Sequence, residues 1–155
     1  MRIHLIAVGT RMPAWVQAGY EDYARRLPRE CALQLVEIPA GRRTRSGSAR
    51  ALAREGDRML AAVPREAAAI ALDVDGRPWS TEQLAGHLRS WLGEGRDRAL
   101  LVGGPDGLDP RCRARADATW SLSALTLPHP LVRVVLAEQL YRAWTVICGH
   151  PYHRG

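Results

Sequence analysis

Five short apolar runs alternate along the chain with stretches whose apolar residues recur at helical spacing. The runs are residues 2–8, 32–38, 67–73, 98–102 and 119–122. Strands that alternate with helices form a mainly parallel sheet that is flanked by helices on both faces. The pattern therefore predicts the α/β fold class, and the length of 155 residues predicts a single domain over residues 1–155.

Capping residues mark the ends of the expected helices. The longer helices are expected at residues 14–27, 49–63, 80–92 and 131–148. Ser48 and Ser80 can cap the second and third of these helices, and Gly149 ends the last one. Asp109, followed by a proline, is expected to open an additional short helix.

Excess positive charge points to a polyanionic partner. The formal net charge is +6 and the pI is about 10.0, with every basic side chain an arginine, so nucleic acid is the expected partner. Residues 40–50, with four arginines and no apolar period, predict a mobile basic loop. The clustered arginines are Arg42, Arg43, Arg45, Arg50, Arg54, Arg111, Arg113 and Arg115. They can contact an RNA backbone, although a solvated face of a merely basic enzyme remains open.

Cysteine usage and the N-terminus indicate a cytoplasmic protein. Cys31, Cys112 and Cys148 are odd in number and widely spaced, which predicts no disulfide framework. The first apolar run ends at Gly9, too early for a signal peptide, and no run is long enough to cross a membrane.

Three loops follow expected strands and are candidate ligand sites, because ligands bind beyond the carboxyl ends of parallel strands. They are the expected turn at residues 74–78, the segment Gly103–Gly107, and residues 123–130. The adjacent glycines let a ligand approach the backbone closely, but they fit no dinucleotide or P-loop pattern and can be plain turn residues. The mostly apolar stretch from Leu122 to Pro130 is either a buried crossover or the wall of a pocket for a flat heteroaromatic ring.

The last expected helix is apolar nearly all round, so it is either central or covered by a second subunit, and its C-terminal position favours a dimer interface. Glu138 lies within it, one turn before Arg142. These two residues form an i,i+4 ion pair, or the carboxylate orients the tail or an active-site group.

The C-terminal tail carries candidate chemistry. Cys148, His150 and His153 resemble half of a metal site, but no second ligand cluster lies nearby in sequence, and we expect no metal. Tyr152, His153 and Arg154 offer a stacking ring, a base and a phosphate contact, unless the tail is disordered.

Several segments together resemble the bacterial large-subunit rRNA pseudouridine N3-methyltransferase family, over essentially the whole chain. The segments are IAVGTRMPAWVQAGYEDYARRLP, EIPAGRR, LDVDGRPWS, LVGGPDGL, WSLSALTLPHPLVRVVLAEQLYRAW and HPYHR. The resemblance implies a SPOUT fold, an α/β sheet whose C-terminal part is threaded into a trefoil knot. It also implies S-adenosylmethionine as cofactor, a homodimer, and methylation of a pseudouridine in the helix 69 loop of 23S rRNA on the assembled ribosome.

The matched motifs imply site residues. The cofactor pocket is expected to be lined by Leu72, Gly103, Leu122, Ser123, Ala124, Leu125, Thr126 and Leu127. The residues expected to serve substrate and catalysis are His129, Glu138, Tyr152, His153 and Arg154. His153 or His129 would take the N3 proton, Arg154 would hold phosphate or the developing anion, and Tyr152 would stack on the base. A non-catalytic ribosome assembly factor and a metal-dependent nucleotide hydrolase remain alternatives.

Overall fold

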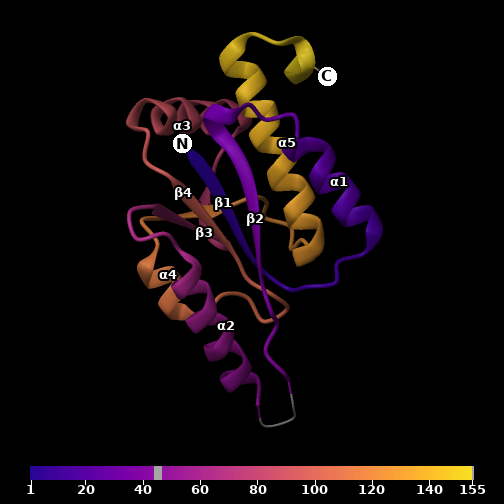
Figure 1. Ribbon diagram of the computed structural model, residues 1–155, viewed down its shortest axis with the longest axis vertical. Helices are drawn as coiled ribbons and strands as arrows, with labels where there is room; N and C mark the ends of the chain where they lie inside the picture. Colours follow the sequence, from indigo (N-terminus) through magenta and orange to yellow (C-terminus); the bar gives the residue numbers. More distant parts are fainter. Residues whose placement is uncertain (44–46, 155) are drawn as a thin grey trace.

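A parallel five-stranded sheet forms the centre of the computed structural model, which describes residues 1–43 and 47–154 (Figure 1). The strands are β1 (Arg2–Val8), β2 (Ala32–Ile38), β3 (Ala68–Pro78), β4 (Arg98–Val102) and β5 (Ala118–Ser121). Their order across the sheet is β2-β1-β4-β3-β5, and every pair is parallel. The predicted α/β fold is confirmed.

Helices cover both faces of this sheet (Figure 1). One layer contains α1 (Ala14–Ala24), α3 (Thr81–Glu94) and α5 (His129–Cys148), and the opposite layer contains α2 (Ser48–Ala62) and α4 (Pro110–Arg115). Two short 3-10 turns are η1 (Arg29–Cys31) and η2 (Pro151–Arg154). Side chains alternate along β1, so that Leu5 packs toward the first layer and Ile6 toward the second.

The last helix is central within its layer. It packs against α1 on one side and α3 on the other. Its own side chains Leu136, Leu140 and Ala143, which face the sheet, are fully buried. Several of its other apolar side chains, including Val135 and Val146, are only half-buried. The central position therefore explains why the inner face of α5 is apolar. Its outer face keeps apolar surface that a second subunit could cover.

No helix in the described part of the chain combines the length and the apolarity required to cross a bilayer.

Local capping chemistry fixes several boundaries as predicted. The Ser80 hydroxyl accepts from the backbone N–H of Gln83, whose side chain accepts from the Ser80 N–H, which completes a capping box at α3. Asp109 caps α4 through a single bond, in which its carboxylate accepts from the backbone N–H of Arg111. Gly149 ends α5 in the left-handed conformation, with φ of 72°, which glycine adopts without steric cost.

Several expected boundaries are wrong for identifiable reasons. The helix expected at residues 14–27 ends at Ala24, because the N–H groups of Arg26 and Leu27 bond to carbonyl oxygens three residues back and not four. Gly47, and not Ser48, is the N-cap of α2, because Ser48 already lies in the first helical turn and forms no capping hydrogen bond. The expected turn at residues 74–78 is part of β3, since Arg77 and Pro78 pair with Trp120 and Ser121. The last helix begins at His129, because Pro130 is tolerated in its first turn.

The end of β3 approaches β5 unusually closely. Leu72 and Arg77 both pair with Trp120, with a register shift between them. A Cβ at Gly76 would lie 2.8 Å from the backbone of Thr119 and Trp120, so only glycine fits at this contact. The trefoil knot that the resemblance implies stays a prediction.

Candidate active site

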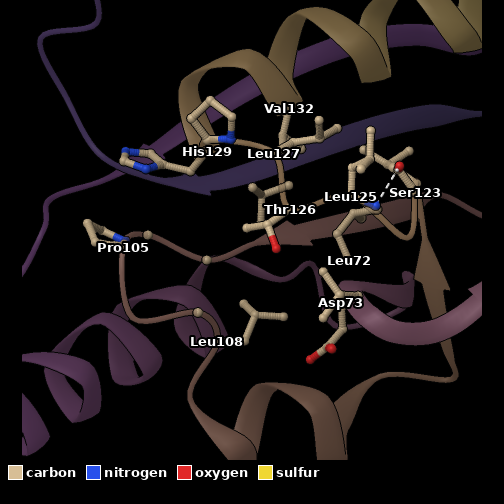
Figure 2. Close-up of a pocket in the computed structure, with 17 residues that line it drawn as sticks. Leu72, Asp73, Pro105, Leu108, Ser123, Leu125, Thr126, Leu127, His129 and Val132 are labelled. Carbon is tan, nitrogen blue, oxygen red and sulfur yellow. Dashed lines mark hydrogen bonds between the residues drawn. The ribbon is translucent and has the colours of Figure 1, made fainter.

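The middle of β3 and the connections that follow β4 and β5 meet at one edge of the sheet and enclose a cleft of about 540 Å³ (Figure 2). This volume lies within the range of roughly 300–1,000 Å³ that is typical of small-molecule sites. The lining residues are Leu72, Asp73, Val74, Val102, Gly103, Gly104, Pro105, Gly107, Leu108, Leu122, Ser123, Leu125, Thr126, Leu127, Pro128, His129 and Val132. Two of the three loops that the sequence singled out, at residues 103–107 and 123–130, therefore meet at this cleft, whereas only Val74 of the expected turn at residues 74–78 lines it.

Most of the expected cofactor residues line this cleft. Leu72, Gly103 and Leu122 lie on its wall together with Ser123 and the segment 125–127, whereas Ala124 is exposed and does not line it. Asp73 also lines the cleft, although it was not among the expected cofactor residues; it directly follows a buried run. Its carboxylate accepts from the Arg113 guanidinium at 2.8 Å, so Asp73 is held in place by α4.

Two features shape the cleft for a flat, partly polar ligand. Leu72, Val102 and Leu108 supply apolar wall, while the turn at residues 103–107, which we call the glycine turn, lines it with three glycines. A Cβ at Gly103 would come within 2.3 Å of the Gly107 carbonyl carbon, so this turn cannot close with any other residue at that position. Backbone groups without side chains can read the edge of a heteroaromatic ring by hydrogen bonding.

The segment after β5 is held by its own hydrogen bonds. The Ser121 hydroxyl donates to the Ser123 carbonyl oxygen at 3.1 Å. The Ser123 hydroxyl accepts from the Leu125 N–H at 2.9 Å, as Figure 2 shows. Leu125 lies at the cleft with 74 % of its surface exposed. The structure thus favours the interpretation that residues 122–130 form the wall of a pocket over the alternative that they form a fully buried crossover.

His129 is the one expected catalytic residue on the cleft wall. Its Nε2 would be 3.5 Å from a Cβ at Gly9, so the β1 connection passes close to the imidazole. The neighbouring Arg133 is 1 % exposed and donates to Glu37 Oε2 and the Gly9 carbonyl oxygen, both at 2.7 Å. Burial and then the Arg133 and Arg43 guanidinium groups lower the pKa of His129, which favours the neutral imidazole, the form that accepts a proton.

Glu138 anchors the C-terminal tail. Its Oε1 accepts from Arg142 Nε at 2.8 Å and from the Tyr152 hydroxyl at 3.1 Å, and its Oε2 accepts from Gln139 Nε2 at 2.8 Å. The Tyr152 ring also packs edge-on against Tyr141, and the Arg142 guanidinium lies over it. The predicted ion pair is present, and the same carboxylate orients the tail.

The end of the tail is ordered through Arg154 as a 3-10 turn. His153 Nδ1 is buried without a hydrogen-bond partner among the described residues, and Arg154 is exposed. The tail follows one end of α5 and His129 begins the other end (Figure 1). At a rise of about 1.5 Å per residue the 20-residue helix spans roughly 30 Å, so one chain does not bring these groups together.

The clustered arginines divide into two kinds. Arg43, Arg111, Arg113 and Arg115 are engaged by carboxylates of the chain itself. Within residues 1–43 and 47–154, no ion pair or hydrogen bond engages the exposed side chains of Arg42, Arg50 and Arg54, and Arg45 lies outside the described residues. The free cations thus lie on the connection before α2 and on α2 itself.

Across the described chain, no three His, Cys, Asp or Glu side chains gather as a metal ion would require. Cys148 and His150 at the end of α5 are exposed.

The fold and the cleft define an α/β protein with a candidate ligand site at the carboxyl ends of parallel strands. Over residues 1–153 the chain matches the family described as "Predicted SPOUT methyltransferase". It belongs to the SPOUT methyltransferase family, a class of enzymes.

Relatives with high identity cover the whole chain. One from Methylococcus capsulatus is 63% identical over 155 residues, which are 99% of this chain and 100% of the relative. One from Thioalkalivibrio sulfidiphilus is 61% identical over 155 residues, 99% of each chain. Both are named "Ribosomal RNA large subunit methyltransferase H".

Solved structures share the fold at low identity. A probable methyltransferase from Bordetella pertussis has a TM-score of 0.54 at 18% identity, covering 92% of both chains. A probable methylase family protein from Haemophilus influenzae has a TM-score of 0.55 at 14% identity, covering 97% of this chain and 69% of that one. These likenesses concern the fold alone.

Proposed function

We propose that this chain transfers a methyl group from S-adenosylmethionine to N3 of a pseudouridine in the helix 69 loop of large-subunit rRNA. It acts in the cytoplasm on the assembled ribosome, as a homodimer of single-domain subunits and without a metal. The observation that carries the proposal is the cleft at the glycine turn, in a chain whose full-length relatives are named for large-subunit rRNA methylation.

The residues of the cleft fit the adenosyl group of that cofactor. An adenine ring needs apolar faces and hydrogen-bonding edges, which Leu72 and Leu122 and the backbone of the glycine turn can supply. When bound, the cofactor supplies a methyl group on a positively charged sulfur, activated for in-line displacement. The protein's main contribution is then to hold donor and acceptor in line.

The protein must also remove the N3 proton of the substrate base. His129 is suited to accept it, because burial and neighbouring guanidinium groups keep its imidazole neutral. The exposed Arg154 would bind phosphate or stabilise the developing anion, and His153 is the alternative proton acceptor.

We further propose that each active site is shared between subunits. Since α5 separates the tail from the cleft of its own chain, a tail can reach a cleft only in a partner. Large apolar side chains near the cleft support such packing, because Val74 and Leu125 on its wall are 56% and 74% exposed. The half-buried outer face of α5 is the expected centre of the contact.

Mass spectrometry of 23S rRNA tests the activity. Ribosomes from cells that lack this protein should carry one methyl group fewer at the helix 69 pseudouridine, and the purified protein with S-adenosylmethionine should restore it. Normal methylation in the deleted strain contradicts the proposal. Calorimetry with S-adenosylmethionine distinguishes the proposed enzyme from the alternative of a non-catalytic assembly factor. The assembly factor would bind ribosomes but have no affinity for S-adenosylmethionine.

A further inference from the structure

A buried carboxylate on α2 binds the connection that follows β2. Glu55 is 2% exposed, and its Oε2 accepts from the Gly41 N–H at 2.8 Å and from Arg43 Nη1 at 2.7 Å. Its Oε1 accepts from Arg43 Nη2 at 3.1 Å. This two-pronged contact fixes the direction of the Arg43 side chain, since a guanidinium held at two nitrogens cannot rotate.

The same arginine reaches the glycine turn. Its remaining Nε donates to Asp106 Oδ2, and Asp106 lies between the glycines that line the cleft. Below the turn, a Cβ at Gly104 would be 3.9 Å from Glu55 Oε1. The Arg43 guanidinium therefore links the buried carboxylate of α2 directly to the cleft.

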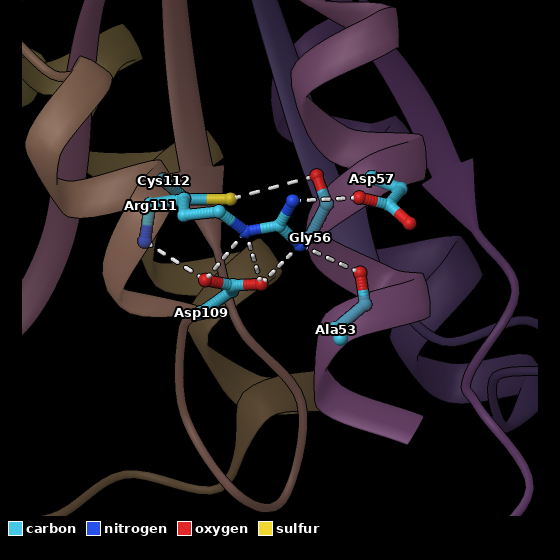
Figure 3. A network of polar contacts seen from close by, with 6 residues as sticks. All are labelled: Ala53, Gly56, Asp57, Asp109, Arg111 and Cys112. Carbon is cyan, nitrogen blue, oxygen red and sulfur yellow. Dashed lines mark hydrogen bonds and ion pairs between the residues drawn. The ribbon is translucent and has the colours of Figure 1, made fainter. Parts of the chain in front are cut away.

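The residues just after the glycine turn are also joined to α2 by hydrogen bonds and ion pairs (Figure 3). Asp109 accepts from Arg111 Nη2 at 2.7 Å, and the same nitrogen donates to the Ala53 carbonyl oxygen at 2.9 Å. Arg111 Nη1 also donates to Asp57 at 2.8 Å. Consequently α2 holds the glycine turn through Asp106 and its downstream end through Asp109.

We propose that Arg43, Glu55 and Asp106 are positioning residues for the cofactor, and that their network holds the glycine turn in the conformation that receives the adenosyl group. The physical reason is that glycines leave a turn many conformations, so an unrestrained turn must be ordered each time a ligand binds. A turn ordered in advance removes that cost from binding. This inference rests on the proposed function.

Asp106→Asn is the most direct test, because Asp106 is partly exposed and its loss should not unfold the protein. We expect its dissociation constant for S-adenosylmethionine, measured by calorimetry, to rise about 10-fold. The melting temperature and the KM for ribosomes should stay at the wild-type values. Asp106→Glu keeps the charge and should recover most of the affinity, and Glu66→Gln, at a 94% exposed side chain, is the matched control.

A double-mutant cycle separates positioning from the direct attraction of a carboxylate for the positively charged cofactor. If Asp106 acts through Arg43, Asp106→Asn should have no further effect in an Arg43→Met protein. Additive losses overturn the proposal, as does wild-type affinity in both single variants. If the wild-type protein itself binds no S-adenosylmethionine, the proposed function fails instead.

Discussion

His129 is set apart by its surroundings. It lies on the cleft wall next to the fully buried Arg133, whose charge is compensated by Glu37 and by the carbonyl oxygen of Gly9. Burial is the main cause of the lowered pKa of His129, and the arginines add to it. In an otherwise basic protein this side chain can remain a proton acceptor near neutral pH.

The lowered pKa of His129 makes stability depend on pH in a defined direction. Below about pH 6.5 the unfolded chain binds a proton on this residue that the folded chain resists, so its contribution to the free energy of unfolding falls as pH decreases. We expect His129→Gln to lessen the loss of stability between roughly pH 6.5 and 5. Urea unfolding of both proteins across this interval measures the effect.

Above roughly pH 7.5 the histidine is neutral in both states, so the two stability curves should run parallel. Identical pH dependence for the two proteins would mean that this residue titrates alike when folded and unfolded.

At the scale of elements, α2 supports the cleft from the face of the sheet opposite α5. Gly56 allows this support, because Asp109 packs directly on the helix backbone there (Figure 3). A Cβ at Gly56 would lie 2.1 Å from Asp109 Oδ2. Glycine is therefore required at this position because α2 and the Asp109 cap of α4 are in direct contact there.

Gly56→Ala should destabilise the protein by about 1–3 kcal/mol, because relief of the overlap must displace α4 or the Asp109 cap. Gly86→Ala is the matched control, since Gly86 lies on α3 with nothing within 4 Å of the added Cβ. There the usual preference of helices for alanine should stabilise by about 0.5–1 kcal/mol. Denaturant unfolding measures the change in the free energy of unfolding for both variants. Stabilisation of equal size at both sites would contradict the prediction, because it would show that Asp109 can move away from the added Cβ at no cost.

At the scale of the whole molecule, α5 decides how the active site is assembled. The tail follows the end of α5 that lies away from the cleft, and the Tyr152 hydroxyl ties it back to Glu138 in the middle of the helix. A functional site that uses both groups requires two chains, and the apolar outer face of α5 suits a symmetric contact.

Mixing two inactive variants tests this arrangement. Thr126→Trp fills the cleft, and Arg154→Ala combined with His153→Ala removes the tail groups. If sites are shared, an equal mixture with random exchange of subunits should recover about a quarter of wild-type activity, because half of the dimers hold one intact site of two. Recovery should be absent if each tail serves its own chain, and methyl transfer to ribosomes measures the outcome.

The candidate site was predictable in its parts. Leu72, Gly103 and Leu122 each lie at or just beyond the carboxyl end of a predicted strand, and they do line one cleft. The Glu138–Arg142 pair was also predictable, since i,i+4 residues of a helix are neighbours. The link from Arg43 to Asp106 was not, because it joins residues 63 positions apart.

By itself the sequence determined the kinds and places of the elements, including β1, β2 and β4 and the caps at Ser80 and Gly149, because side-chain periodicity and capping act over a few residues. The tertiary structure alone decided the strand order, the close approach of β3 to β5 at Gly76, and the distance between His129 and the tail. Those features depend on how whole faces pack, and packing joins residues whose separation along the chain carries no local signal.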